Sequence, residues 1–169
     1  MSISSNEFVL LARARFTRHA LRIASMFVLG AALASLVIFA LAAWAYPGGN
    51  HFDHAAKAHD FWRNSLCDVA RGTAIGGASN RVGSLLARVA MSTMALGLGG
   101  LFWLLPHHFE PRPRLGIATC VRALGLVSVP GAIAVTFMPT DRFGVLHGVA
   151  IILAGVPGLG AAVLAMIAL

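Results

Sequence analysis

The chain is organised around one long polar stretch, YPGGNHFDHAAKAHDFWRNSLCDVARGTAIGGASNR (residues 46–81). Long apolar runs lie on both sides of it, so we expect this stretch to be a loop between two membrane-spanning helices. Most side chains that carry chemistry or recognition are concentrated there: His51, His54, His59, Asp53, Asp60, Asp68, Asn50, Asn64 and Asn80. A functional site is therefore expected first in this loop.

The composition excludes a water-soluble domain. Of the 169 residues, 58% are hydrophobic and 11% are charged, and the mean hydropathy is +0.80. A soluble domain carries about 25% charged residues, because its surface must be covered with groups that water solvates. The chain is therefore expected to be an integral membrane protein with a single helical bundle.

The basic excess does not indicate a nucleic-acid partner. The net charge is +7, from 13 basic and 6 acidic residues. The arginines flank apolar runs, where they orient helices and meet anionic lipid headgroups. Arg88 and Arg122, about two turns inside their spans, are expected to extend back to the membrane surface. Cys67 and Cys120 fall in a loop and a span, which favours free thiols.

Residues 1–21 form a basic segment ahead of the first apolar run. Ser4 and Glu7 have the spacing of a capping box at a helix start, and Arg15 and Arg18 fall on one face of the helix that would follow. A basic amphipathic helix of this kind lies on the cytoplasmic headgroups. The alternative is an ordinary positively charged flank with no separate role.

Four apolar runs predict an all-α, polytopic transmembrane bundle over residues 22–169. At about 1.5 Å per residue, each run is long enough to cross a hydrocarbon core of about 30 Å. The spans are expected at 22–46, 82–105, 115–138 and 142–169. Trp44 and Tyr46 are predicted to anchor the first span at the membrane surface. That span exceeds the length of a signal-peptide core, which indicates an uncleaved signal anchor.

Glycines in two spans predict close helix contacts. Gly97 and Gly100 thin the second span, and Gly144 and Gly148 have the G-x-x-x-G spacing in the fourth. Small residues at such positions let a neighbouring backbone approach. We therefore expect these four glycines at helix-packing faces.

The distribution of basic residues predicts the orientation. Arginines cluster before the first span, whereas the turn around Asp141 carries only Arg142. Positive loops stay on the cytoplasmic side, so both termini are expected in the cytoplasm. The 47–81 loop and the Asp141 turn then share the outer face.

The shared outer face predicts a candidate polar pocket. Its residues would be Asn64, Asp68, Asn80, Asp141 and His147. An ionisable group at the depth of His147 is a functional candidate by default. A short interfacial helix over 54–64 is expected to continue far enough to bring Asn64 and Asp68 onto one face. Whether that face points inward or to water stays open at this point.

Histidines at the outer face give a weak indication of a metal site. His51, His54, His59 and His147 could hold zinc together with carboxylates, leaving one position open for water. The alternative is that these histidines bond to backbone or headgroups. His147 has no evident partner histidine in the other spans for a haem. No cofactor is therefore expected.

Four short motifs resemble a bacterial membrane-protein family known as domain of unknown function 998. They are Y-P-G-G (46–49), N-S-L-C-D (64–68), G-A-S-N (77–80), and P-T-D (139–141) with His147 downstream. The chain departs from the family in Cys67, where serine is expected, and in having fewer spans, which favours a shortened chain. The resemblance brings no established activity. It implies a bacterial source and one shared face for the five pocket candidates.

Two functions remain at the level of sequence. The first is a non-catalytic accessory or structural subunit of a larger membrane complex in the bacterial cytoplasmic (inner) membrane. Its partners would be lipid and other membrane subunits. The second is an intramembrane enzyme or lipid-binding protein that uses the outward pocket. The placement of Asp68 and His147 separates them, and the first is preferred, which favours a protein that is not an enzyme.

Overall fold

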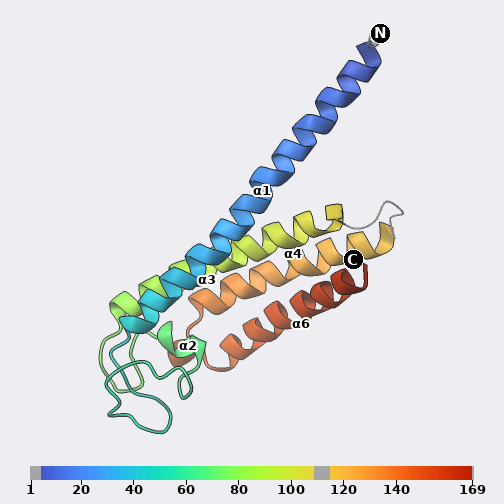
Figure 1. The fold of residues 1–169 in the computed structure, drawn as a ribbon. Helices are drawn as coiled ribbons and strands as arrows, with labels where there is room; N and C mark the ends of the chain where they lie inside the picture. Colours follow the sequence, from blue (N-terminus) through green and yellow to red (C-terminus); the bar gives the residue numbers. More distant parts are fainter. Residues whose placement is uncertain (1–4, 109–114, 169) are drawn as a thin grey trace.

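Four long helices make up most of the chain in the computed structural model (Figure 1). The structure describes the backbone of residues 5–108 and 115–168, and the side chains of residues 18–107 and 116–168. The long helices are α1 (Ser5–Trp44), α3 (Arg81–Leu104), α4 (Leu115–Phe137) and α6 (Val145–Ala168). The short elements are α2 (Leu66–Val69), the 3-10 turn η1 (Leu105–His108) and α5 (Thr140–Phe143). The all-α, four-span prediction is confirmed.

Each long helix supplies most or all of a segment that is long and apolar enough to cross a membrane, and the second segment continues from α3 into η1. These segments are Arg18–Trp44, Arg81–His107, Gly116–Phe137 and Val145–Ala168. The fourth begins later than predicted, because Thr140–Phe143 forms a separate turn of helix that ends at Gly144. Gly144 has a φ of +45°, in the left-handed region that favours glycine. The chain is therefore a multi-pass membrane protein whose last span begins after this turn.

The basic N-terminal segment is not a separate helix. Residues 5–17 continue into the first span as one helix that ends at Trp44 (Figure 1). No proline occurs in this segment and its first glycine is Gly30, so nothing in it breaks the helix. Residues 1–4, with the predicted cap at Ser4, lie outside the described residues.

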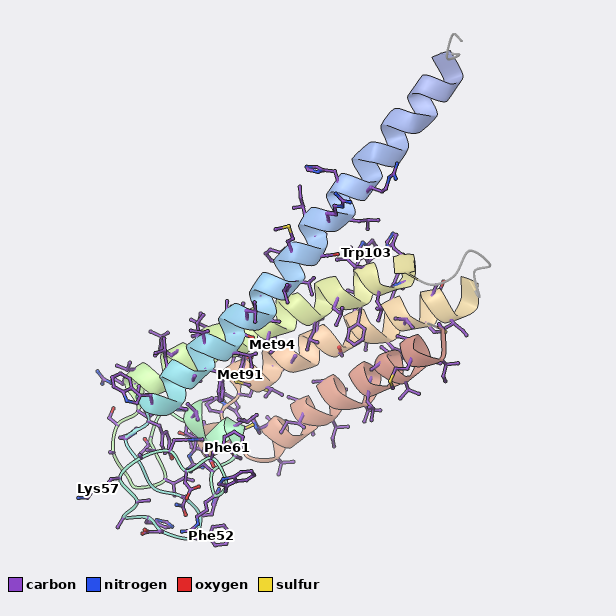
Figure 2. All side chains as sticks on the ribbon, in the orientation of Figure 1. Phe52, Lys57, Phe61, Met91, Met94 and Trp103 are labelled. Carbon is purple, nitrogen blue, oxygen red and sulfur yellow. The ribbon has the colours of Figure 1, made fainter. Side chains whose placement is uncertain are left out.

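Neighbouring helices pack in the order α1, α3, α4, α6, with alternating directions (Figure 1). α1 crosses α3 at an angle and extends well past the other helices. Met91 and Met94 of α3 lie at this crossing (Figure 2), where the Ser35 hydroxyl is 3.8 Å from the Met94 sulfur. A hydrophobic core joins α3, α4 and α6 towards the C-terminal ends of α3 and α6 and the N-terminal end of α4. It is built on Phe102, Val121 and Ala161.

Glycines set the distances between these helices. A Cβ added at Gly97 would lie 3.1 Å from Ala31 Cβ, and one at Gly100 would lie 3.0 Å from Val28 Cγ2, both in α1. α4 and α6 approach more closely still, since a Cβ at Gly131 would lie 2.5 Å from the Ala154 nitrogen. The backbones meet directly there, as small residues permit in membranes.

The predicted G-x-x-x-G face of the fourth span needs a correction. Gly144 ends α5 and precedes α6, so it does not share a helix face with Gly148. A Cβ added at either glycine would meet nothing within 4 Å among the described residues. Gly131 of α4 instead makes the close approach to α6, at Ala154.

We predict that Gly131→Ala destabilises the bundle, whereas Gly155→Ala does not. Both changes gain the same helix propensity, but only the first places a methyl against the α6 backbone, and Gly155 has open space. Overpacking of this kind costs about 1–3 kcal/mol. Thermal unfolding in a mild detergent should show a lower midpoint for Gly131→Ala than for Gly155→Ala. Equal midpoints would contradict the close α4–α6 approach.

Candidate functional site

Residues 46–80 fold into a compact loop structure, here called the cap, at the ends of α1 and α3 (Figure 2). A small core attaches it to the helices: Val69 and Ala70 pack against Ala42 of α1 and Ala87 of α3. The short helix α2 supplies Val69 and therefore fills the space between the two spans. The cap is held at a fixed position relative to the membrane-spanning helices.

The interfacial helix predicted over 54–64 is absent, and turns replace it. Asn50 Oδ1 accepts hydrogen bonds from the backbone N–H groups of Phe52 and Asp53, both at 2.9 Å. Asp53 Oδ1 and Asp60 Oδ1 likewise accept hydrogen bonds from the backbone N–H groups two residues ahead, those of Ala55 and Trp62. Side chains of this type offer the backbone an alternative to helical bonds, so the segment turns repeatedly.

Tyr46 is the centre of the cap and not a membrane anchor as predicted. Its side chain is 2% exposed. Its hydroxyl accepts a hydrogen bond from the Ile75 N–H at 3.0 Å and donates one to the Gly49 carbonyl at 3.3 Å. One phenol thus joins the first and last thirds of the cap. Burial raises the pKa of this phenol above its usual 10.0.

Two glycines after Tyr46 allow the backbone strands of the cap to meet. Gly48 and Gly49 have φ values of +119° and +85°. A Cβ at Gly48 would overlap the Ala56 carbonyl, and one at Gly49 would overlap the Gly76 nitrogen. The Y-P-G-G motif therefore encodes a buried tyrosine followed by a crossing that only glycine permits.

Asn64 and Asn80, predicted for a pocket, hold the cap backbone together. Asn64 Nδ2 donates to the Gly49 carbonyl at 2.9 Å, and its Oδ1 accepts from the Asp60 N–H at 2.9 Å. Asn80 Nδ2 donates to the carbonyls of Val69 and Arg71, at 2.8 and 2.9 Å. Both side chains are buried within the cap.

Asp68 is a buried carboxylate, and one of its oxygens accepts a backbone hydrogen bond. It is 2% exposed, and its Oδ2 accepts from the Ser65 N–H at 2.7 Å in a capping box at the start of α2. Its Oδ1 lies 3.7 Å from Nε2 of the exposed His51. Burial, together with this carboxylate, raises the pKa of the neighbouring free thiol of Cys67. Asp68 thus stabilises α2 and places negative charge inside the cap.

His59 is a second partly buried ionisable group of the cap, within electrostatic reach of Asp68. Its ring meets the Tyr46 ring edge-on, with 5.8 Å between centroids, and its Nε2 is buried without a hydrogen-bond partner. Burial lowers its pKa below the usual 6.5, against the opposite pull of Asp68 and Asp60. Neutral imidazole is therefore the form that the folded cap favours.

The Asp141 turn lies against the cap, as the orientation argument predicted. A Cβ added at Gly72 would lie 3.8 Å from Asp141 Oδ2 and 3.6 Å from Arg142 Nη2. Asp141 is exposed, whereas His147 is 4% exposed and its Nδ1 hydrogen-bonds the Met138 carbonyl at the end of α4. The turn and the cap share one end of the bundle.

The five pocket candidates are not joined into one bonded group among the described residues. Asn64, Asp68 and Asn80 lie within the cap, and among the described residues no hydrogen bond or ion pair joins them to Asp141 or His147. Nor are His51, His54, His59 and His147 gathered into one site: the described residues include no group of three or more His, Cys, Asp or Glu placed to hold a metal. Sequence reasoning named Tyr46 and Asn50 but missed their structural roles in the cap, and the signal for these roles was the Y-P-G-G-N order itself.

We predict that Tyr46→Phe loosens the cap. The change leaves the Ile75 N–H without its acceptor, and an unpaired buried donor costs about 1–3 kcal/mol. Hydrogen exchange followed by mass spectrometry should accelerate in the peptides that carry Gly49 and Ile75. Phe52→Leu, at an exposed position, is the control and should leave their exchange unchanged.

We predict that acidification loosens the cap through His59. Because its folded pKa lies below 6.5, the unfolded segment binds the proton more tightly. The stabilisation is complete above pH 6.5 and is lost as the pH falls from there toward the lower folded pKa. The hydrogen-exchange rate of the backbone amides in the cap, corrected for its intrinsic pH dependence, should rise as the pH falls through that window. His59→Gln should flatten the change, and His54→Gln, at an exposed position, should keep it.

Comparisons with family models, curated proteins and solved structures gave no match to this chain. The resemblance to domain of unknown function 998 therefore stays a prediction that rests on its motifs. In the structure, the three motifs that lie in residues 46–80 share a physical role. Tyr46, Asn64, Asp68 and Asn80 all bond to the backbone of the cap.

Proposed function

We propose that the chain is a non-catalytic subunit of a larger membrane complex and that the cap is its docking surface. The observation that carries this proposal is a group of exposed aromatic side chains on the cap. Phe52, Phe61 and Trp62 are 81%, 69% and 88% exposed, although they lie outside the spans (Figure 2). Aromatic residues are enriched where proteins bind one another.

The cap suits a docking role because its shape is fixed before any partner arrives. Buried polar side chains bond its backbone at many points, so little conformational freedom is left to lose on binding. Phe61 and Trp62 also order one another through an edge-to-face contact, with 5.1 Å between ring centroids. Rigid aromatic anchors of this kind dominate the energy of many interfaces.

The first span supports the same proposal. α1 meets the rest of the chain mainly through α3, where it buries small residues such as Ala31, Ser35 and Ala42. Its large apolar side chains face away from the bundle, among them Met26, Phe27, Leu33, Leu36 and Val37. This side of α1 suits a partner span as well as lipid.

The proposal includes a location and an orientation. The protein would lie in the bacterial cytoplasmic membrane with both termini in the cytoplasm, in line with the arginine distribution. The cap and the Asp141 turn would then face the outside. A partner would reach Phe52, Phe61 and Trp62 from that side.

A second candidate is a lipid-binding protein or intramembrane enzyme that uses the outward polar residues. One observation favours it: Asp68 Oδ1 and His51 Nε2 lie 3.7 Å apart, close enough for an electrostatic interaction between a carboxylate and an imidazole. The subunit proposal is preferred because Asn64 and Asn80, expected beside Asp68 in that pocket, bond to the backbone.

We predict that the native assembly depends on the cap aromatics. In mild detergent, the wild-type protein should migrate well above monomer mass on native electrophoresis, with a companion in constant stoichiometry. The double change Phe61→Ala and Trp62→Ala should weaken that association about tenfold or more. Trp44→Ala is the matched control, because Trp44 is 85% exposed at the end of α1 but lies outside the cap. A wild-type band at monomer or dimer mass would refute the subunit proposal.

A further inference from the structure

Three buried polar atoms outside the cap have no hydrogen-bond partner among the described residues. They are Arg88 Nε in α3, Thr140 Oγ1 in α5 and His147 Nε2 in α6. Buried polar groups are nearly always paired, so each unpaired one needs an explanation. One lies about two turns inside α3 and the other two lie near the starts of α5 and α6, and together they point to a group that the described residues do not supply.

The helix register places these atoms at one depth. Gly99 of α3 lies against Val129 of α4, and Arg88 precedes Gly99 by as many residues as Thr140 follows Val129. α3 and α4 run in opposite directions (Figure 1). The count therefore places Arg88 near the level at which α4 ends. The interval from Gly99 is about three turns, so Arg88 also lies on the side of α3 that meets α4.

His147 reaches the same level from α6. Its Nδ1 bonds to the Met138 carbonyl, two residues before Thr140. His147 also precedes Ala154 by about two turns, and the Ala154 backbone meets Gly131 of α4. The histidine therefore lies on the side of α6 that faces α4, as Arg88 does on α3.

The two arginines inside spans differ in their partners, and this difference indicates what kind of ligand Arg88 could bind. Arg122 is satisfied within the chain, since its Nε donates to the Trp103 carbonyl at 3.3 Å and its guanidinium lies 5.4 Å from the centre of the Trp103 ring. Arg88 takes part in neither ion pair of the described residues, which join His51 to Asp68 and Arg63 to Asp60. The buried Nε of Arg88, with no carboxylate beside it among the described residues, is suited to an external anion.

The donor set fits a phosphate oxyanion. The Met138 carbonyl can only accept, so His147 Nδ1 carries a proton and Nε2 is free to accept one from a ligand hydroxyl. Arg88 only donates, and the Thr140 hydroxyl does both. A singly protonated phosphate has oxygens for Arg88 and Thr140 and an O–H for His147. The level of Arg88, about two turns inside α3, is near the lipid headgroups.

We propose that Arg88, Thr140 and His147 form a phosphate-binding site between the outer ends of α3, α4 and α6. The phosphate is either the headgroup of an anionic lipid or a free ion. The site does not depend on the proposed subunit role, because its residues lie outside the cap and make no use of the exposed aromatics.

The test uses the full-length protein in a phosphate-free maltoside detergent. One arm adds sodium phosphate against sodium chloride of equal ionic strength. The other adds a short-chain phosphatidic acid against an uncharged diacylglycerol of the same chains. Native mass spectrometry and the thermal unfolding midpoint report binding. Response to both additives identifies a phosphate site, and response to the lipid alone identifies a headgroup site.

Matched variants connect the binding to these residues. Arg88→Gln and Thr140→Val should weaken phosphate binding, the first by about tenfold or more because it removes a charge-assisted hydrogen bond. Arg122→Gln removes an equal charge from a partnered arginine and should bind like the wild type. Thr140→Val preserves shape, so it tests the site even if Arg88→Gln fails to fold. Equal weakening by Arg88→Gln and Arg122→Gln, or no response to either additive, would overturn the proposal.

Discussion

The structure depends on one constraint at the membrane surface: backbone groups that leave a helix there must still find partners. The cap meets this constraint with side chains. The Tyr46 hydroxyl and the amides of Asn64 and Asn80 bond to backbone groups far apart in sequence, and Asp68 caps α2. Because these side chains are buried, the cap has one conformation and the aromatic residues on its surface have fixed positions.

The spans could be predicted from sequence because a membrane imposes a length and an apolar composition on any helix that crosses it. The cap could not, because its turns follow from local competition between side chains and backbone. Asn50, Asp53 and Asp60 each bond to backbone N–H groups ahead of them and replace the helix that the aromatic pattern indicated. Tyr46 was misplaced for a related reason: an aromatic residue at the end of a span usually marks the headgroup level, and only tertiary contacts place it inside.

The candidate site was predicted in part. Its residues lie in the cap and around the Asp141 turn, which alternating spans bring to the same end of the bundle. Their roles differ from those expected, since Asn64, Asp68 and Asn80 bond to the cap and His147 bonds to α4. The unpaired atoms of Arg88 and Thr140 could not be found from sequence, because they emerge only once the register of α3 against α4 is known.

The length of α1 has a mechanical consequence. Its 40 residues make a rod of about 60 Å, roughly twice the thickness of the hydrocarbon core. Residues 5–17 therefore extend about 20 Å past the spanning segment. A helix resists bending over such a distance, and the C-terminal end of α1 is joined to the cap through Ala42 and Val69. A tilt of the N-terminal part of α1 on one side of the membrane would therefore also move the cap on the other side.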